Sequence, residues 1–534
     1  MIQKVSRGAF GRDSGRDSGR DSGRDSRNEL FPTEGWRLLL PDVSPTRVVA
    51  LGDGSTAATA RRLWPGADTG RADDRPVDLV VADSPDAATL AAVAELLDPT
   101  TTAYLEFDWP RHRSYGALRH RLGRAGLPVT TLYSISPGRH RWAATWWIPV
   151  DSPRAARFIA AQLTPSGSRS ANPVDRLRRH LLTRWQRNPD PVARRPWLLH
   201  PSRRQRLGVV IGGPRIGDSG ERTTATIMKI GGSSTDQPIL FEFGLRPGPV
   251  SGASTGPAGE PDVVIKVPQR AEEIEASRRE AEVLTNLARL DPPVSLIPRA
   301  VDPRRYRAAG LQAFGQTYAS GRPMAVVATP EALPEHAAAV GDWLLDLAGR
   351  TARPADPERV GATLHRRMVE LEGSLSALPD GAEMSRALAA AAGDIDRSVA
   401  VHRHNDLGPW NVQVTATGRI TVIDWADATT DGIPACDFIH FLAHLGFCAH
   451  DAYGPGRRER LTAELVDPST PLGRFVWRAT ADHVVRVGLT AEQIPQLRLL
   501  TWALDLLRRP PEQRTSGLYL ELIRAELRRR TSHP

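Results

Sequence analysis

Residues 404–425 read HNDLGPWNVQVTATGRITVIDW, and this stretch decides the fold expected of the C-terminal part of the chain. Asp406 stands five residues before Asn411, and Asp424 follows Asn411 after a further thirteen. Between the last two, a Thr-Gly pair signals a turn and the apolar run after it indicates a strand. We therefore expect a hairpin that returns Asp424 to the end where Asn411 lies.

These three side chains form the set that phosphoryl transfer from a nucleotide requires. Asp406 is placed to accept the proton of a substrate hydroxyl group. Asn411 and Asp424 offer the oxygen ligands that hold Mg²⁺ against nucleotide phosphates. The spacing thus predicts a catalytic base and two metal ligands on one loop and hairpin.

An upstream strand offers a partner for that loop. Residues 263–267 read VVIKV, which resembles the V-A-I-K element of protein kinases, whose Lys pairs with the nucleotide phosphates and with a Glu on the next helix. Lys266 is that Lys, and Glu280 is the expected Glu. Glu282 is the alternative, but residues two apart on a helix do not share a face.

Lysine usage draws attention to the same strand. The chain has 70 Lys and Arg residues, of which only Lys4, Lys229 and Lys266 are Lys. A compact ammonium group differs from the planar guanidinium in how it contacts phosphate, so a surviving Lys can mark a functional need. We make that inference for Lys266 and treat Lys4 and Lys229 as chance survivors.

From about residue 206 to residue 534, the motifs resemble the aminoglycoside phosphotransferase and choline kinase-like small-molecule kinases. HNDLGPWN is similar to that family's H-G-D-x-x-x-x-N loop, and IDWADATTDGIPACDF is similar to its metal-binding and structural segments. Asn405 stands where the family usually has Gly. The resemblance implies that Asp437 braces the catalytic loop.

The resemblance also implies a two-lobed α+β protein-kinase-like fold, with an N-lobe at 206–328 and a helical C-lobe at 329–534. It implies ATP or GTP with Mg²⁺, and a hydroxylated small molecule as phosphate acceptor. Between Thr329 and His450, Asp and Glu outnumber Arg, which favours an amine-bearing or cationic acceptor.

The loop that should cover the phosphates is less specific. Residues 211–220 read IGGPRIGDSG and lie between two strand-like runs, so Gly217 and Gly220 are the candidate cofactor-binding residues. The segment is not a G-x-G-x-x-G, and the same residue types form ordinary hairpin turns. Residues 231–261 are rich in Gly, Ser and Pro and suggest a long mobile loop before the Lys266 strand.

Residues 31–165 form a second predicted globular domain. Apolar strands alternate with helical stretches in the βαβ rhythm of a parallel sheet, and two final strands form a hairpin. We predict an α/β doubly wound, Rossmann-like sheet that resembles the class I S-adenosylmethionine-dependent methyltransferases. Its first turn has Gly52 and Gly54 but Ala57 in place of a third Gly. No acidic residue clearly closes a second strand to bind a ribose hydroxyl group, because residues 66–76 resemble a loop. We therefore expect a degenerate domain that binds S-adenosylmethionine weakly or not at all.

The remaining segments are a tail and a linker. Residues 1–30 include four Gly-Arg-Asp-Ser repeats without apolar residues and are predicted to be disordered. Residues 166–205 are rich in Arg, but no aromatic platform accompanies them, so we expect no nucleic-acid partner despite the net charge of +9. No apolar run approaches the length of a membrane span or a signal peptide, which favours a cytoplasmic protein.

Two classes of function follow. The first is an ATP-dependent kinase of a hydroxylated small molecule, favoured by the complete set of Lys266, Glu280, Asp406, Asn411 and Asp424. The second is a binding or scaffold protein that keeps the kinase fold without turnover, which the weak phosphate loop leaves open. Methyltransferase activity in the N-terminal domain is a further alternative, and it requires cofactor binding at residues 52–55.

Overall fold

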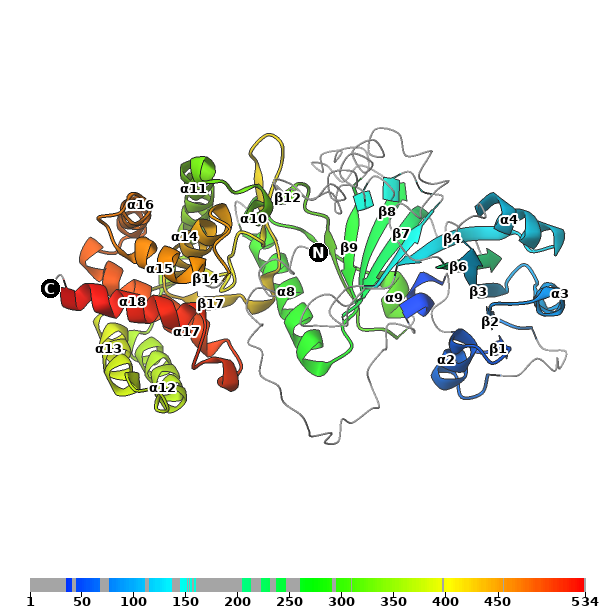
Figure 1. Cartoon of the computed structure of the whole chain (residues 1–534), viewed down its shortest axis with the longest axis horizontal. Coiled ribbons are helices and arrows are strands. Elements are labelled where there is room, and N and C mark those ends of the chain that lie inside the picture. The colour runs from blue at the N-terminus through cyan, green and yellow to red at the C-terminus, as the bar shows by residue number, and fades with distance from the viewer. Residues whose placement is uncertain are drawn as a thin grey trace. The chain divides into compact units, whose positions relative to one another are not determined.

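The computed structural model divides into two compact units, each considered by itself (Figure 1). The first runs through Ser277 and adds Ala300–Tyr318, and the second takes Arg278–Arg299 and everything from Ala319 onward. The structure describes residues 35–40, 45–67, 76–110, 115–136, 145–150, 152, 154–155, 158–159, 204–212, 222–230, 237–245, 260–290, 294–308, 310–395, 398–454 and 456–532. The predicted N-terminal tail and nearly all of the Arg-rich linker lie outside these residues.

The first unit is built on a mixed sheet of eleven strands in the order β1-β2-β3-β6-β4-β5-β7-β8-β9-β11-β10. The strands are β1 (Val48–Leu51), β2 (Leu79–Asp83), β3 (Thr102–Pro110), β4 (Val129–Ser136), β5 (Thr145–Pro149), β6 (Arg204–Gly212), β7 (Arg222–Ile230), β8 (Ile239–Leu245), β9 (Val263–Lys266), β10 (Ala300–Val301) and β11 (Phe314–Thr317). Its helices are η1 (Gly35–Leu39), α2 (Ser55–Leu63), α3 (Ala87–Leu96), α4 (Tyr115–Arg124), α9 (Arg304–Ala308) and the start of α8 (Ala271–Arg289).

The doubly wound, methyltransferase-like sheet predicted for residues 31–165 is not confirmed. Among the described strands, parallel pairing is confined to β1 with β2 and β2 with β3. The strand β6 then pairs antiparallel with both β3 and β4. The apolar patterns predict strands at residues 47–51, 77–83, 101–107, 129–136 and 140–150, and β1 to β5 lie close to these ranges. Because β6 comes from residues 204–212, a strand of the predicted kinase N-lobe completes the sheet of the predicted N-terminal domain.

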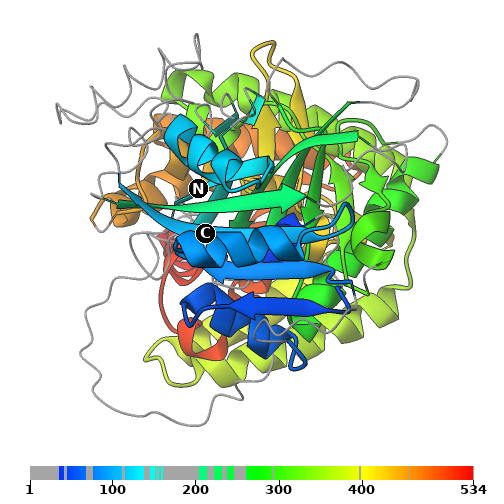
Figure 2. The same ribbon diagram turned by 90° about the vertical axis from the view of Figure 1, so that its right-hand side faces the viewer.

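Helices cover both faces of this part of the sheet, as Figures 1 and 2 show. Leu90 and Val93 of α3 and Leu118 and Leu122 of α4 pack on one face. Ala57 and Ala60 of α2 pack on the opposite face together with η1. Two separate apolar cores therefore fix the strand register, since a slip by one residue would exchange the two faces.

The second unit is mainly helical. Its helices are the end of α8, α10 (Met324–Val327), η3 (Pro330–Ala332), α11 (Leu333–Thr351), α12 (Pro357–Leu375), α13 (Gly381–Asp394), η4 (Trp425–Asp427), α14 (Cys436–Ala449), α15 (Arg457–Val466), α16 (Pro471–Arg486), η5 (Ala491–Gln493), α17 (Ile494–Leu507), η6 (Pro511–Gln513) and α18 (Leu518–Ser532). Its two small sheets have the orders β12-β15-β16 and β13-β14-β17. These strands are β12 (Arg322–Pro323), β13 (Arg353–Pro354), β14 (Val399–Arg403), β15 (Val412–Val414), β16 (Ile420–Val422) and β17 (Thr429–Gly432).

The helices α14 and α17 form the centre of this unit and are buried almost all round. Shorter polar signals fix where other helices begin. Asp356 caps α12 by accepting hydrogen bonds from the backbone N–H groups of Glu358 and Arg359, and Thr470 caps α16 through the N–H of Gly473. Among the described residues, no helix has the length and apolar character needed to cross a membrane.

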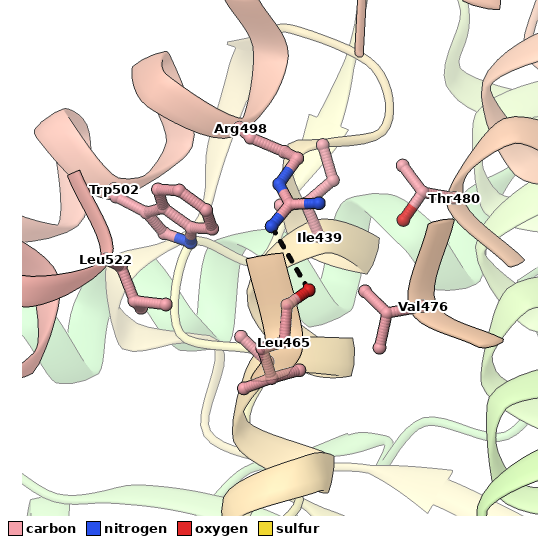
Figure 3. A pocket seen from close by; sticks show the side chains of 8 residues that line it. Ile439, Leu465, Val476, Thr480, Arg498, Trp502 and Leu522 are labelled. Carbon is pink, nitrogen blue, oxygen red and sulfur yellow. Dashed lines mark hydrogen bonds between the residues drawn. The ribbon is translucent and has the colours of Figure 1, made fainter. Parts of the chain in front are cut away.

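A buried ion pair lies between α17 and α18. Arg498 and Glu526 are 2% and 0% exposed, and the Arg498 Nε lies 3.2 Å from a Glu526 carboxylate oxygen. Figure 3 shows the Arg498 guanidinium reaching into a small apolar cavity and donating to the Leu465 carbonyl at 3.4 Å. The guanidinium also contacts the rings of Trp477 and Trp502, at 4.9 and 5.1 Å from their centroids.

This pair predicts a stability effect. Arg498→Met should lower the free energy of unfolding by about 3 kcal/mol, because it leaves the Glu526 charge buried with only Arg529 as partner. The double variant Arg498→Met/Glu526→Leu should recover most of that loss, since it removes both buried charges. Urea unfolding of the two variants measures both changes. Equal stability of the single variant and the wild type would contradict this account.

Candidate functional site

The loop that carries Asp406 starts at the end of β14, and one carboxylate holds it. Asp437, at the start of α14, accepts hydrogen bonds from the backbone N–H groups of His404 at 2.6 Å and Asn405 at 3.1 Å. It also forms a buried ion pair with Arg403 at 3.2 Å. Asp437 therefore braces the loop directly before Asp406, as the family resemblance implies.

The backbone conformation explains why Asn405 can stand where the family usually has Gly. Its backbone has φ = 64°, in the left-handed region where Gly is usual and Asn is the best-tolerated alternative. The Asn405 side chain adds what Gly cannot supply, since its Nδ2 donates to the Asp427 carbonyl at 2.8 Å and lies 3.3 Å from Thr429 Oγ1. The substitution keeps the backbone geometry and ties the loop to the segment that follows η4.

Asp406 and Asn411 lie in direct contact. The Nδ2 of Asn411 donates to the Asp406 backbone carbonyl at 2.8 Å and to its Oδ2 at 3.1 Å. Asn411 is 3% exposed, so its amide orientation is fixed by these bonds. With both amide hydrogens directed at Asp406, the amide oxygen of Asn411 faces away and can act as a ligand.

The hairpin of β15 and β16 brings Asp424 to the same end as Asn411. Val412 pairs with Val422, and the Ile423 N–H donates to the Asn411 carbonyl at 2.9 Å. His404 Nε2 lies 2.9 Å from the Ile423 carbonyl and joins the loop that carries Asp406 to the end of β16. Asp424 itself has φ = 69°, so the chain turns sharply there and leaves β16.

This donor set suits Mg²⁺. Asn411 and Asp424 supply an amide oxygen and a carboxylate, and Mg²⁺ usually combines one or two such ligands with water and substrate phosphates. In the part of the chain that the structure describes, no three His, Cys, Asp or Glu side chains gather as a ready-made metal cluster. Asn411 and Asp424 are the residues that could hold the ion together with nucleotide phosphates.

Sequence reasoning did not identify Arg508, which follows α17. Its guanidinium forms an ion pair with Asp427 and lies 3.7 Å from Asp406 Oδ1 and 3.8 Å from Asp505 Oδ1. Burial lowers the pKa of Arg508, but the three surrounding carboxylates outweigh that effect and raise the pKa above its usual value. Asp406 is consequently held on both oxygens, by Asn411 on one and by Arg508 on the other.

Asp505 and His440 lie behind Arg508. Asp505 is buried and lies 2.7 Å from the Nδ1 of His440. Burial would raise the pKa of the Asp505 carboxyl group, but His440 and Arg508 hold it below its usual value. No short motif marks these residues, because the contacts join positions that are far apart in the sequence.

In the first unit, Lys266 ends β9 in the centre of the kinase-like part of the sheet. Lys266 pairs with Ile239 of β8, and Ile239 pairs with Lys229 of β7. Directly opposed residues of antiparallel strands point to the same face, so two of the three lysines of the chain share one row. Lys229 lies over the Trp146 ring, and burial lowers its pKa. Its presence in this row is information that sequence reasoning missed.

The helix α8 distinguishes the two candidate glutamates. Glu280 is 4% exposed and shares the buried face of α8 with Ser277, Leu284 and Leu287, whereas Glu282 is exposed. Helical spacing of three or four residues accounts for that face. The structure therefore gives Glu280, rather than Glu282, the inward position.

The candidate phosphate-covering residues Gly217 and Gly220 lie outside the described residues. The flanking strands are described, and their pairing shows at which end of the sheet they meet this segment. The strand β6 ends and β7 begins at the end of the sheet opposite Lys266. From Arg222 to Lys229, β7 runs about 24 Å. By contrast, β8 begins beside the Lys266 row. Because β8 spans Ile239–Leu245, part of the range 231–261 that the sequence suggested as a long loop is a strand of the sheet.

The Gly-rich turn after β1 has a structural explanation. The second strand, β2, ends at Asp83, so the expectation that no acidic residue closes a second strand is wrong. A Cβ atom on Gly54 would lie 2.5 Å from the Cβ of Asp83. The Asp83 carboxylate accepts hydrogen bonds from Ser55 Oγ at 3.1 Å and from the Thr56 N–H at 3.3 Å. The start of α2 is therefore satisfied by a carboxylate of the chain itself, and Gly54 permits that close approach.

Comparison with known proteins finds a family match for the middle and C-terminal parts of the chain. Residues 253–468 match the model of the phosphotransferase enzyme family. This range contains Lys266, Glu280, Asp406, Asn411 and Asp424, and it ends before Arg508. The match supports a phosphotransferase in this part of the chain, and no curated protein matches the chain.

Several solved structures are similar at low identity. A glucosamine kinase is 16% identical, over 59% of this chain and 94% of that chain, with a TM-score of 0.32. An aminoglycoside phosphotransferase from Streptomyces rimosus, in complex with ADP and streptomycin, is 15% identical over 54% of this chain and 94% of that chain, with a TM-score of 0.31. An ADP-bound aminoglycoside phosphotransferase is 16% identical, over 52% of this chain and 95% of that chain, with a TM-score of 0.29.

Proposed function

We propose that this protein transfers the γ-phosphoryl group of a nucleoside triphosphate to a hydroxyl group of a small molecule. The observation that carries the proposal is the contact of Asn411 with the Asp406 carboxylate, beside the hairpin that returns Asp424. A base and two oxygen ligands on one rigid loop and hairpin are the parts that phosphoryl transfer needs.

In the proposed reaction, the acceptor oxygen forms a bond to the γ-phosphorus and the bond from that phosphorus to the bridging oxygen breaks. The hydroxyl proton passes to Asp406, whose carboxylate is held in place by Asn411 and Arg508. Asn411 and Asp424 would hold Mg²⁺, which supplies charge neutralisation to the phosphates. Lys266, with Glu280 as its partner, is assigned to the α- and β-phosphates by the resemblance to kinases.

The acceptor is proposed to be a hydroxylated small molecule with an amine group. Asp406 and Asp427 border the loop, and Asp427 is half exposed. Arg508 neutralises part of the negative charge of Asp406 and Asp427. The proposed preference for an acceptor with an amine group therefore rests on the negative charge that Arg508 leaves uncompensated. A screen of hydroxylated acceptors with and without an amine tests this choice.

The test of the main proposal is nucleotide binding with and without Mg²⁺, followed by turnover with the acceptor screen. A phosphotransferase should bind nucleotide more tightly with Mg²⁺ and release nucleoside diphosphate when a suitable acceptor is present. Nucleotide binding without turnover on any acceptor would favour a kinase-fold binding or scaffold protein. Absence of nucleotide binding would overturn the proposal.

Lys266→Arg is expected to be a damaging substitution, although the chain uses Arg almost everywhere else. The longer planar guanidinium should misplace the phosphates, so kcat should fall about 10²-fold while nucleotide affinity changes less. Lys266→Met removes the charge and should weaken both. Steady-state kinetics separates the two effects, and wild-type turnover by the Arg variant would refute the role assigned to Lys266.

A further inference from the structure

The two carboxylate oxygens of Asp406 have different surroundings. Oδ2 accepts a hydrogen bond from the Nδ2 of Asn411 at 3.1 Å. Among the residues that the structure describes, none donates a hydrogen bond to Oδ1, and the Nη2 of Arg508 stands 3.7 Å away, beyond hydrogen-bond length. A general base must come within about 2.6–3.2 Å of the hydroxyl oxygen whose proton it takes. Oδ1 is therefore the oxygen that Asp406 can offer to an acceptor hydroxyl group.

Arg508 is kept at this distance by Asp427. The same Nη2 atom donates a hydrogen bond to the Oδ2 of Asp427, and the Nη1 atom lies 3.8 Å from the Oδ1 of Asp505. The two nitrogens belong to one planar group, so the bond to Asp427 also fixes how close that group comes to Asp406. Asp427 and Asp406 thus compete for one guanidinium group, and Asp427 holds the direct bond.

The backbone around Asp427 keeps its carboxylate in place. The Asp427 carbonyl accepts a hydrogen bond from the Nδ2 of Asn405 at 2.8 Å. Two residues earlier, Trp425 is 0% exposed, and its ring centroid lies 4.8 Å from that of His404. The helix η4 is thereby anchored at both ends, so Asp427 does not follow the guanidinium group of Arg508 if that group moves.

Without the charge of Asp427, the guanidinium group would turn to Asp406. Asp505 is buried and already lies 2.7 Å from the Nδ1 of His440, whereas Oδ1 is the open oxygen of Asp406. Charge-assisted hydrogen bonds from Arg to a carboxylate are about 2.7–2.9 Å long, so a shift of about 1 Å would close the gap of 3.7 Å. The closed pair would occupy the oxygen that the acceptor hydroxyl needs. It would also make Asp406 a weaker proton acceptor, because a bonded cation favours the charged carboxylate.

We propose that Asp427 is a positioning residue, which holds Arg508 away from the Oδ1 of Asp406 and so keeps that oxygen available to the acceptor hydroxyl. This inference rests on the proposed function, because it takes Asp406 as the base. During transfer, the hydroxyl proton passes to Oδ1 as the acceptor oxygen bonds to the γ-phosphorus and the bond from that phosphorus to the bridging oxygen breaks. Arg508 orients the Asp406 carboxylate from 3.7 Å, and Asp427 limits its approach.

Crystal structures of the full-length wild type and of Asp427→Asn test this geometry without any acceptor. Asn keeps the size of the side chain but removes its charge. Arg508 should therefore move onto Asp406 and bring the Nη2–Oδ1 distance from 3.7 Å to below about 3.2 Å. An unchanged distance would overturn the inference. If Asp427→Asn does not fold, Asp427→Ser, which also lacks the charge, takes its place.

Turnover of ATP with the hydroxylated acceptors of the screen measures the consequence. In Asp427→Asn, kcat should fall about tenfold with amine-bearing and amine-free acceptors alike, because the loss concerns the base. The Kd of ATP should stay near that of the wild type, since Asn411 and Asp424 are untouched. Asp427→Glu keeps the charge and should retain most of the turnover. Asp431→Asn is the matched control, because Asp431 is also a half-exposed carboxylate paired with Arg residues, and it should leave turnover unchanged.

The double variant Asp427→Asn/Arg508→Gln separates this role from a merely structural one. Without the guanidinium group, residue 508 cannot close onto Oδ1, so the double variant should turn over faster than Asp427→Asn alone. Equal or slower turnover of the double variant, or wild-type kcat in Asp427→Asn, would overturn the inference and leave the proposed function intact. A rise in KM confined to amine-bearing acceptors would also overturn it, and would assign Asp427 to binding of the amine. Absence of ATP binding or of turnover in the wild type would instead overturn the proposed function.

Discussion

Asp406→Asn should abolish phosphotransfer while nucleotide binding stays close to that of the wild type. The substitution removes the proton acceptor but keeps the size of the side chain, and it leaves Asn411 and Asp424 unchanged. A general base contributes about 10²- to 10⁴-fold to the rate, so the loss should be the largest of any single substitution proposed for this chain. Single-turnover phosphotransfer and nucleotide titration measure the two quantities separately.

A nearby surface carboxylate provides the control. Asp431 on β17 forms ion pairs with Arg353 and Arg359 at the surface, and its replacement by Asn removes a charge without touching the catalytic loop. Exposed ion pairs contribute little to stability, so Asp431→Asn should retain full activity. Equal turnover in Asp406→Asn and Asp431→Asn would show that Asp406 is not the base.

The sequence was sufficient to place individual elements because their signals are local. Alternating apolar residues and Gly-containing turns predicted β1 to β5 and the β15–β16 hairpin close to their observed bounds. The order of the strands in the sheet could not be predicted from such local signals. β6 pairs Gly212 with Thr102, about a hundred residues earlier, and any strand with two apolar faces could have taken that place.

The candidate site divides in the same way. Asp406, Asn411 and Asp424 could be named as candidates because they occupy one loop and the hairpin after it with fixed spacing. Arg508 could not, since it approaches Asp406 from another helix and is one of many Arg residues. Asn405 was recognised only as a departure from a pattern, and its positive φ supplies the physical reason.

Asp424→Ala should remove the effect of Mg²⁺ on nucleotide binding. The wild type is expected to bind nucleotide more tightly with Mg²⁺, because the Asp424 carboxylate joins the ion to the chain while the phosphates bind its other side. Water can replace one ligand oxygen but not the negative charge. Calorimetric titration of the full-length protein with a non-hydrolysable nucleotide, with and without Mg²⁺, measures this difference.

The backbone at Asp424 requires a second variant. Because φ is 69° there, Ala would also strain a left-handed position, whereas Asn tolerates that conformation and keeps one oxygen ligand. Asp424→Asn should therefore fold like the wild type, show a weaker Mg²⁺ effect and retain binding of nucleotide alone. The expected order of the Mg²⁺ effect is wild type, then Asn, then Ala. The same Mg²⁺ effect in all three proteins would limit Asp424 to shaping the turn after β16 and would assign the metal to other ligands.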